Sequence, residues 1–139
     1  MFLLDTDVAS LLRRQDRHPQ AARWLSAQRS SDVYLSVVTL AEVERGIAQQ
    51  RRRNPPFAAE LTGWLERILD WHADRILPVD AGIARRWVQL CGDLGYVNAD
   101  LLIAATALEH GLTVVTRIVK HFEPAAVPVY NPFVDSGTE

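Results

Sequence analysis

Short apolar runs alternate with helical patterns along the whole chain, and this alternation limits the fold more than any other feature. Five runs have strand character, and they cover residues 2–5, 32–37, 75–79, 112–116 and 127–130. Parallel strands need a crossover between them, usually a helix, so strands that alternate with helices indicate a mainly parallel sheet. The sequence therefore predicts an α/β domain with helices on both faces of the sheet.

Local start and stop signals mark the helices between these strands. Asp7 is a candidate N-cap, and Pro19 suits a first helical turn. Asn54, followed by two prolines, marks a stop. Asn98 and Gly111 are placed to begin and end the last helix. The expected helices cover residues 7–13, 19–29, 39–53, an amphipathic stretch from Phe57 to Ile68, and residues 81–93 and 99–110.

The composition is that of one ordinary globular domain. The chain has 139 residues, of which 48% are apolar and 23% charged. Its apolar runs are far shorter than the ~20 residues that cross a bilayer, and we expect neither a membrane partner nor a signal peptide after Met1. Cys91 is the single cysteine, so no internal disulfide is possible and a cytoplasmic location is expected. The net charge of −2 does not by itself demand a nucleic-acid partner.

Three carboxylates stand at junctions between the expected elements. Asp5 ends the first strand, Glu42 lies one turn into the helix after the second strand, and Asp100 lies in the first turn of the last helix. If the first strand is central, all three converge on one edge of the sheet. Nearby carboxylates repel one another, so such a cluster requires a cation or shared protons. Mg²⁺ and Mn²⁺ suit oxygen ligands and accept phosphate oxygens, which suggests phosphodiester chemistry.

Each of these acids also has a purely structural explanation. Thr39 and Glu42 match the capping box S/T-x-x-E at the start of a helix. Asp100 is placed to interact with a helix dipole, and Asp5 is placed to accept backbone N–H groups in a turn. The spacing alone leaves both interpretations open.

With these residues in view, the chain is similar to a PIN domain of the VapC toxin ribonuclease type. The matching stretches are LLDTDV (3–8), SVVTLAEVERGI (36–47), ADLLIAATALEHGLTVVTR (99–117) and HFEPAAVPVYNPF (121–133). They run from the first strand to the last, so residues 1–139 are interpreted as a single PIN domain.

The resemblance implies a three-layer α/β/α fold with a five-stranded sheet, and metal-dependent endoribonuclease activity. Asp5, Glu42 and Asp100 match the acidic catalytic positions of the family, and Asp5 and Asp100 match its ligands for Mg²⁺ or Mn²⁺. Glu42 matches a position that binds a second ion or orients the attacking water. Thr6 and Thr116 match hydroxyl positions beside the acids.

The segment after the fourth strand departs from the family pattern. Many relatives read T-R-N-x-x-D-F, whereas this chain reads TRIVKHF, with Ile118 in place of the Asn and His121 in place of the Asp. His121 cannot supply a negative charge; it either contacts a scissile phosphate or packs. An apolar side chain cannot replace the amide, so we expect Ile118 to reduce activity without abolishing it.

The resemblance also implies an RNA substrate, a small antitoxin partner and a toxin homodimer. Arg117 and Lys120 flank the site segment and are candidates for contact with RNA phosphates. The run from Arg51 to Arg53 is either a solvated helix end or a rim that guides RNA. The apolar stripe of Phe57, Trp64 and Ile68 is either core or a surface for the antitoxin or the second protomer.

Two other functions fit parts of the sequence. A degenerate PIN domain would act only as a binding module, and Ile118 and His121 favour it. An apolar run ending in DTD also resembles the opening motif of haloacid-dehalogenase-like phosphatases, in which the first Asp is a nucleophile. That family also needs a basic residue, usually Lys, deep in the chain, and an acidic pair late in the sequence. Lys120 could be the basic residue, but no pair of Asp residues follows it.

Overall fold

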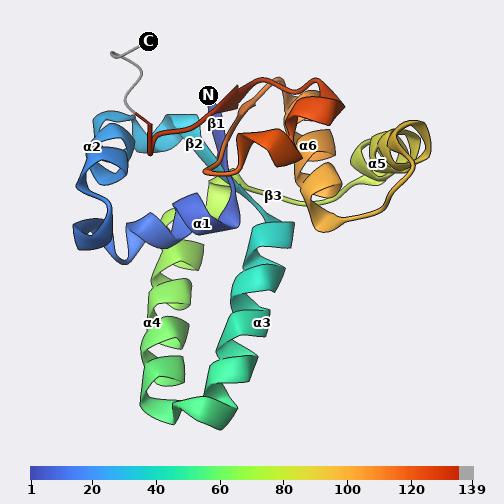
Figure 1. Ribbon diagram of the computed structural model, residues 1–139. Helices are drawn as coiled ribbons and strands as arrows, with labels where there is room; N and C mark the ends of the chain where they lie inside the picture. Colours follow the sequence, from blue (N-terminus) through green and yellow to red (C-terminus); the bar gives the residue numbers. More distant parts are fainter. Residues whose placement is uncertain (135–139) are drawn as a thin grey trace.

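A five-stranded parallel sheet forms the centre of the computed structural model, which describes residues 1–134 (Figure 1). The strands are β1 (Phe2–Leu4), β2 (Val33–Ser36), β3 (Ile76–Leu77), β4 (Thr113–Val115) and β5 (Val129–Tyr130). Their order is β3-β2-β1-β4-β5, and every neighbouring pair is parallel. The predicted α/β class and the five strands are confirmed, although each strand is shorter than its apolar run.

The first strand is central, as convergence of the three acids requires. Leu3 of β1 pairs with Tyr34 of β2 on one side and with Val114 of β4 on the other. The chain builds outwards from β1 to β3 and then returns to place β4 and β5 on the opposite side. Strand order therefore reverses between β1 and β4. In open α/β sheets, the crevice at the carboxyl ends of such strands is the usual ligand site.

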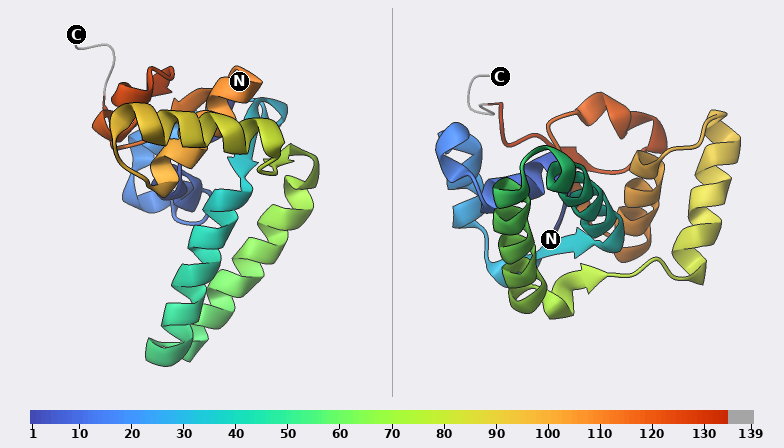
Figure 2. Two further views of the ribbon diagram at one scale, coloured as in Figure 1. Left: turned by 90° about the vertical axis from the view of Figure 1, so that its right-hand side faces the viewer. Right: turned by 90° about the horizontal axis from the view of Figure 1, so that it is seen from below.

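Two apolar cores on opposite faces of the sheet give the fold three layers. The helices are α1 (Thr6–Ala9), α2 (Pro19–Ala27), α3 (Val37–Arg53), α4 (Pro55–Trp71), α5 (Ala81–Leu94) and α6 (Ala99–His110). Successive strand residues point to opposite faces. Leu4 and Val115 accordingly pack with residues of α1 to α4, whereas Leu3 and Val114 pack with residues of α5 and α6. The predicted α/β/α arrangement is confirmed (Figure 2).

Helices α3 and α4 form a long hairpin that projects from the sheet (Figures 1 and 2). Asn54 ends α3 and caps α4, where its Oδ1 accepts a hydrogen bond from the Phe57 N–H at 3.2 Å. Arg51, Arg52 and Arg53 form the last turn of α3 and so lie at the far tip of the hairpin. This position favours a solvated helix end over a rim beside the acids. In the same hairpin, Trp64 and Ile68 are buried in the core.

The ends of the helices follow the local signals in some places and not in others. Helix α6 begins and ends as predicted, with the Asn98 side chain capping Leu101 N–H at 2.9 Å and Gly111 in the left-handed region at φ 65°. The first helix differs, because Asp5 and not Asp7 is its N-cap. It ends at Ala9 and continues as a 3-10 turn over residues 10–12. Among residues 1–134, no helix is both long enough and apolar enough for a membrane crossing.

Candidate active site

Asp5 lies directly beyond the carboxyl end of β1 and is held by two hydrogen bonds. Its Oδ1 accepts from the Thr6 N–H at 2.8 Å, and its Oδ2 accepts from the Thr116 hydroxyl at 2.9 Å. Thr116 follows β4 directly, and its Oγ1 also accepts from the Ile118 N–H at 3.0 Å. The Asp5 side chain is therefore fixed between the two strands where the strand order reverses.

The environment of Asp5 disfavours its charge. Burial raises the pKa of Asp5 to about 6 from its usual 3.8, although the hydrogen bonds from Thr6 and Thr116 lower it in part. The negative charges of Asp7 and Asp100 add to the increase in pKa. A carboxylate that is desolvated and close to other carboxylates is stabilised when a cation binds.

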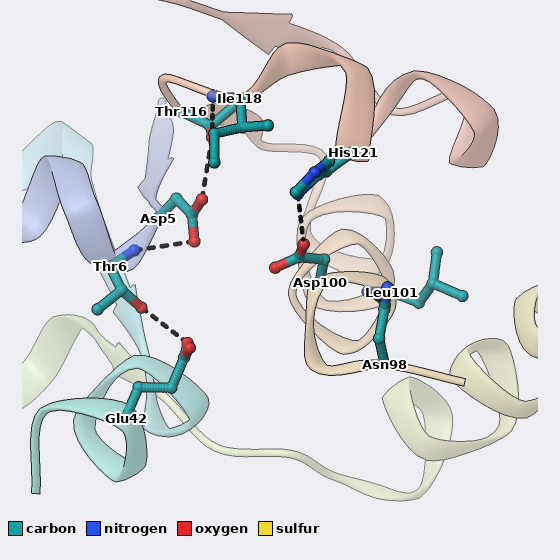
Figure 3. Close-up of polar contacts among 9 residues, drawn as sticks. All are labelled: Asp5, Thr6, Glu42, Asn98, Asp100, Leu101, Thr116, Ile118 and His121. Carbon is teal, nitrogen blue, oxygen red and sulfur yellow. Dashed lines mark hydrogen bonds and ion pairs between the residues drawn. The ribbon is translucent and has the colours of Figure 1, made fainter. Parts of the chain in front are cut away.

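Glu42 is held towards Asp5 by Thr6. The Thr6 hydroxyl donates to Glu42 Oε1 at 2.7 Å, which joins the start of α1 to the second turn of α3 (Figure 3). The alternative role of Glu42, in a capping box with Thr39, is not the one that the structure shows. Helix α3 begins earlier, at Val37, and Ser36 caps it by accepting from the Val38 N–H at 3.0 Å. Thr39 consequently lies inside the helix, and Glu42 is free to face the site.

Asp100 faces the same region from the first turn of α6. Its Oδ2 lies 3.1 Å from His121 Nδ1, and His121 belongs to the 3-10 turn over residues 119–121. Figure 3 shows the carboxylates of Asp5 and Asp100 on opposite sides of a common space, with Glu42 below Asp5. Of the two alternatives for His121, this contact favours a polar role, because the ring engages a carboxylate and is not packed in the core.

These side chains line one open depression of about 450 Å³. Its walls are formed by Asp5, Thr6, Asp7, Ser10, Glu42, Asp100, Ile118 and His121. The structure thus gathers every predicted acid around one hollow. Thr116 is fully buried beneath this hollow, where its hydroxyl holds Asp5.

Asp7 is a residue of the depression that sequence reasoning assigned to another role. Because the helix starts one residue after Asp5, Asp7 is in its first turn and lines the hollow together with Asp5. Burial raises the pKa of Asp7, and its Oδ1 is buried with no hydrogen-bond partner among residues 1–134. The second Asp of the DTD motif was the sequence signal for this position. Because Asp7 was assigned as a helix cap, it was not counted among the acids of the site.

The donor set fits a divalent cation held by few protein ligands. Within residues 1–134, no three His, Cys, Asp or Glu side chains lie close enough together to form a full ligand cage. Mg²⁺ does not need one, because it usually keeps several waters and binds through one or two carboxylates plus substrate phosphates. The desolvated Asp5 and the unpartnered buried oxygen of Asp7 are groups that a hydrated cation would satisfy.

The two cationic candidates occupy different places. Arg117 directly follows Thr116, and its guanidinium carbon lies 4.9 Å from the centre of the Phe133 ring. Lys120 is exposed in the same 3-10 turn as His121. Both therefore lie on the segment that leads from β4 across the edge of the depression.

Comparison with known proteins identifies relatives along the whole chain. The family model described as PIN domain matches residues 2–117. Toxin FitB from Neisseria gonorrhoeae is 38% identical over 97% of this chain and 100% of its own length. VapC ribonuclease Y4jK from Sinorhizobium fredii is 35% identical over 96% of this chain and 98% of its own.

Solved structures with a similar fold point to the same family. The crystal structure of FitAcB from Neisseria gonorrhoeae superposes with a TM-score of 0.84 at 39% identity, over 96% of this chain and 99% of that chain. A toxin–antitoxin complex from Klebsiella pneumoniae gives 0.61 at 27% identity, over 95% and 98%. The haloacid-dehalogenase alternative is therefore wrong. The chain belongs to the PIN-domain family and is similar over nearly its whole length to the VapC and FitB proteins.

Proposed function

We propose that this chain is a metal-dependent endoribonuclease and the toxin of a toxin–antitoxin pair, with residues 1–139 as a single PIN domain. The observation that carries the proposal is Asp5, a buried carboxylate with a pKa of about 6 that faces Asp100 across an open hollow. A residue that served only to cap α1 would have no need of a second acid nearby. The names of the relatives, one a toxin and one a ribonuclease, support the same activity.

Asp5 and Asp100 would hold a divalent cation, Mg²⁺ or Mn²⁺. When bound, such a cation offsets the repulsion between the carboxylates, makes a hydroxide nucleophile accessible at neutral pH and stabilises charge on the phosphodiester. Thr116 fixes the orientation of Asp5 through its hydroxyl. Glu42, held by the Thr6 hydroxyl, orients the attacking water and takes up its proton. His121 holds Asp100 in place, and its exposed ring is the group proposed to contact the scissile phosphate.

A small antitoxin protein is the proposed partner. The toxin–antitoxin complex from Klebsiella pneumoniae, which has the same fold, supports this assignment. An acidic hollow suits an Arg side chain from the antitoxin, since a guanidinium forms paired hydrogen bonds with carboxylates. Homodimer formation stays a prediction.

Cleavage of a mixed tRNA and mRNA pool tests the function. We expect the purified chain to cleave RNA with Mg²⁺ or Mn²⁺, and to be inactive in EDTA. Asp100→Asn serves as the control for contaminating nucleases and should also be inactive. Equal cleavage by the wild type and this variant would contradict the proposal. If the wild type binds metal without cutting any RNA in the pool, the degenerate binding module becomes the better explanation.

Ile118→Asn should increase the cleavage rate by about tenfold. This is the lower end of the range by which residues that hydrogen-bond to metal ligands change activity. Ile118 lines the depression and is 38% exposed, so a polar side chain fits there without loss of core packing. The Asn amide would hydrogen-bond water or substrate in the hollow. Single-turnover rates of the wild type, Ile118→Asn and the matched control Ile118→Val measure the effect. A rate for the Asn variant no higher than that of the Val variant would show that Ile118 does not limit activity.

A further inference from the structure

A second hollow, with four arginines in its walls, adjoins the acidic depression. It measures about 190 Å³, and Asp7 and Ser10 belong to the walls of both hollows. Its remaining polar walls are Arg13, Arg14, Arg17, His18 and Arg117. Sequence reasoning named only Arg117 among these, because the others lie in and around the turns between α1 and α2, far from any recognised motif.

The positive charge of this hollow is not fully neutralised by neighbouring acids. Arg13 lies 3.5 Å from Glu60, and Arg14 lies 3.5 Å from Asp16. Within residues 1–134, neither Arg17 nor Arg117 has a carboxylate oxygen within 4.0 Å. The single acid in the walls is Asp7, against four arginines. The hollow therefore favours an anion.

Arg117 is held so that its hydrogen-bond donors stay available. Its guanidinium lies over the Phe133 ring, and the His18 ring meets the same Phe133 edge-on at 5.0 Å. Stacking uses the face of the guanidinium and leaves the N–H groups along its edge free to form hydrogen bonds. Among residues 1–134, no hydrogen bond from this side chain uses them.

We infer that this hollow is a phosphate subsite for the RNA strand, formed by Arg14, Arg17 and Arg117, and occupied by a backbone phosphate that neighbours the scissile one. The inference rests on the proposed function and adds the path of the substrate. The hollow has room for a phosphate group with a few waters of about 30 Å³ each. Because the two hollows share Asp7 and Ser10, a strand held in one continues into the other. Arg forks match phosphate oxygens in shape and charge.

Binding of a short fluorescein-labelled oligouridylate to the full chain in EDTA tests the subsite without cleavage. We expect Arg14→Gln and Arg17→Gln each to weaken binding by about threefold to tenfold. Each should also reduce the slope of log affinity against log salt by about 0.7, the value expected when one Arg no longer neutralises a phosphate of a single strand. Arg85→Gln removes an exposed charge on α5, in the opposite layer, and should change neither quantity.

Arg52→Gln tests the rival path, because Arg45, Arg52 and Arg53 line another hollow along α3. Weaker binding in this variant alone, equally weakened binding in all four variants, or unchanged binding in every variant would each overturn the subsite. The proposed function is judged separately by cleavage with metal. If the Arg14 and Arg17 variants bind RNA more weakly while the wild type cuts no RNA, the subsite stands and the nuclease proposal falls.

Discussion

Replacing Asp5 by Asn is expected to abolish RNA cleavage and at the same time to stabilise the metal-free protein. If Asp5 holds the proposed cation, losing its charge removes several kcal/mol of transition-state stabilisation, which corresponds to a rate about 10³-fold lower. The Asn side chain keeps the same shape. It still accepts from the Thr6 N–H and donates its amide to Thr116 Oγ1, so the fold should not change.

The gain in stability follows from the charge that Asn removes. Since the folded-state pKa of Asp5 is about 6 and its usual value is 3.8, ionised Asp5 costs about 3 kcal/mol of the free energy of unfolding at neutral pH. A raised folded-state pKa means that the folded protein binds the proton more tightly than the unfolded chain. This cost therefore disappears as the pH falls through about 6 towards about 4.

Urea unfolding in EDTA at several pH values measures this effect. The difference between Asp5→Asn and the wild type should be largest above pH 6 and should shrink below it. Asp93→Asn, at an exposed site on α5, is the matched control and should change stability by less than about 0.5 kcal/mol at any pH. A loss of stability in Asp5→Asn at neutral pH would contradict the description of Asp5 as a desolvated carboxylate.

Phe122→Ala is expected to lower the free energy of unfolding by about 3–5 kcal/mol, the range for deleting a buried aromatic side chain. Phe122 is fully buried, and it belongs to the same core cluster as Leu101 and Ile103, which α5 and α6 cover. This loss is a large part of the total for a domain whose stability is typically about 5–15 kcal/mol. Because His121 precedes Phe122 directly, the contact between His121 and Asp100 should loosen as well.

Thermal and urea unfolding of Phe122→Ala and Phe122→Leu check this prediction. The Leu variant fills most of the space and should lose clearly less stability. Tyr96→Ala is the control for removing an aromatic ring at a site that is 40% exposed, and we expect a change below about 0.5 kcal/mol. Similar losses of stability in Phe122→Ala and Tyr96→Ala would mean that Phe122 does not anchor the segment after β4.

Local signals predicted the parts of the fold that depend on neighbouring residues. Asn98 and Gly111 fixed both ends of α6, because a cap and a left-handed glycine act within a single turn. The same reasoning failed where two residues competed for one role. Asp7 and Asp5 were both candidates to accept N–H groups at the start of α1, and it is Asp5 that caps the helix. Ser36, and not Thr39, caps α3.

The sequence could predict that the three acids converge only if the first strand is central, because the order of strands in a sheet does not depend on neighbouring residues. The sequence suggested that Asp5, Glu42 and Asp100 would meet if the first strand were central, and the pairing of β1 with both β2 and β4 satisfies this condition. The cationic hollow was not predicted. Arg14 and Arg17 lie on turns without periodicity, and only the folded chain brings them beside Arg117.

The hydrogen bond between Thr116 and Asp5 joins residues that are 111 positions apart in the sequence. Asp5 is therefore synthesised 111 residues before Thr116, the residue that positions it. A growing chain thus carries its first acid long before the strand that positions it exists. The acidic depression is completed only after β4 and Thr116 have emerged from the ribosome, so a nascent or truncated chain that ends before Thr116 cannot hold Asp5 in its final orientation.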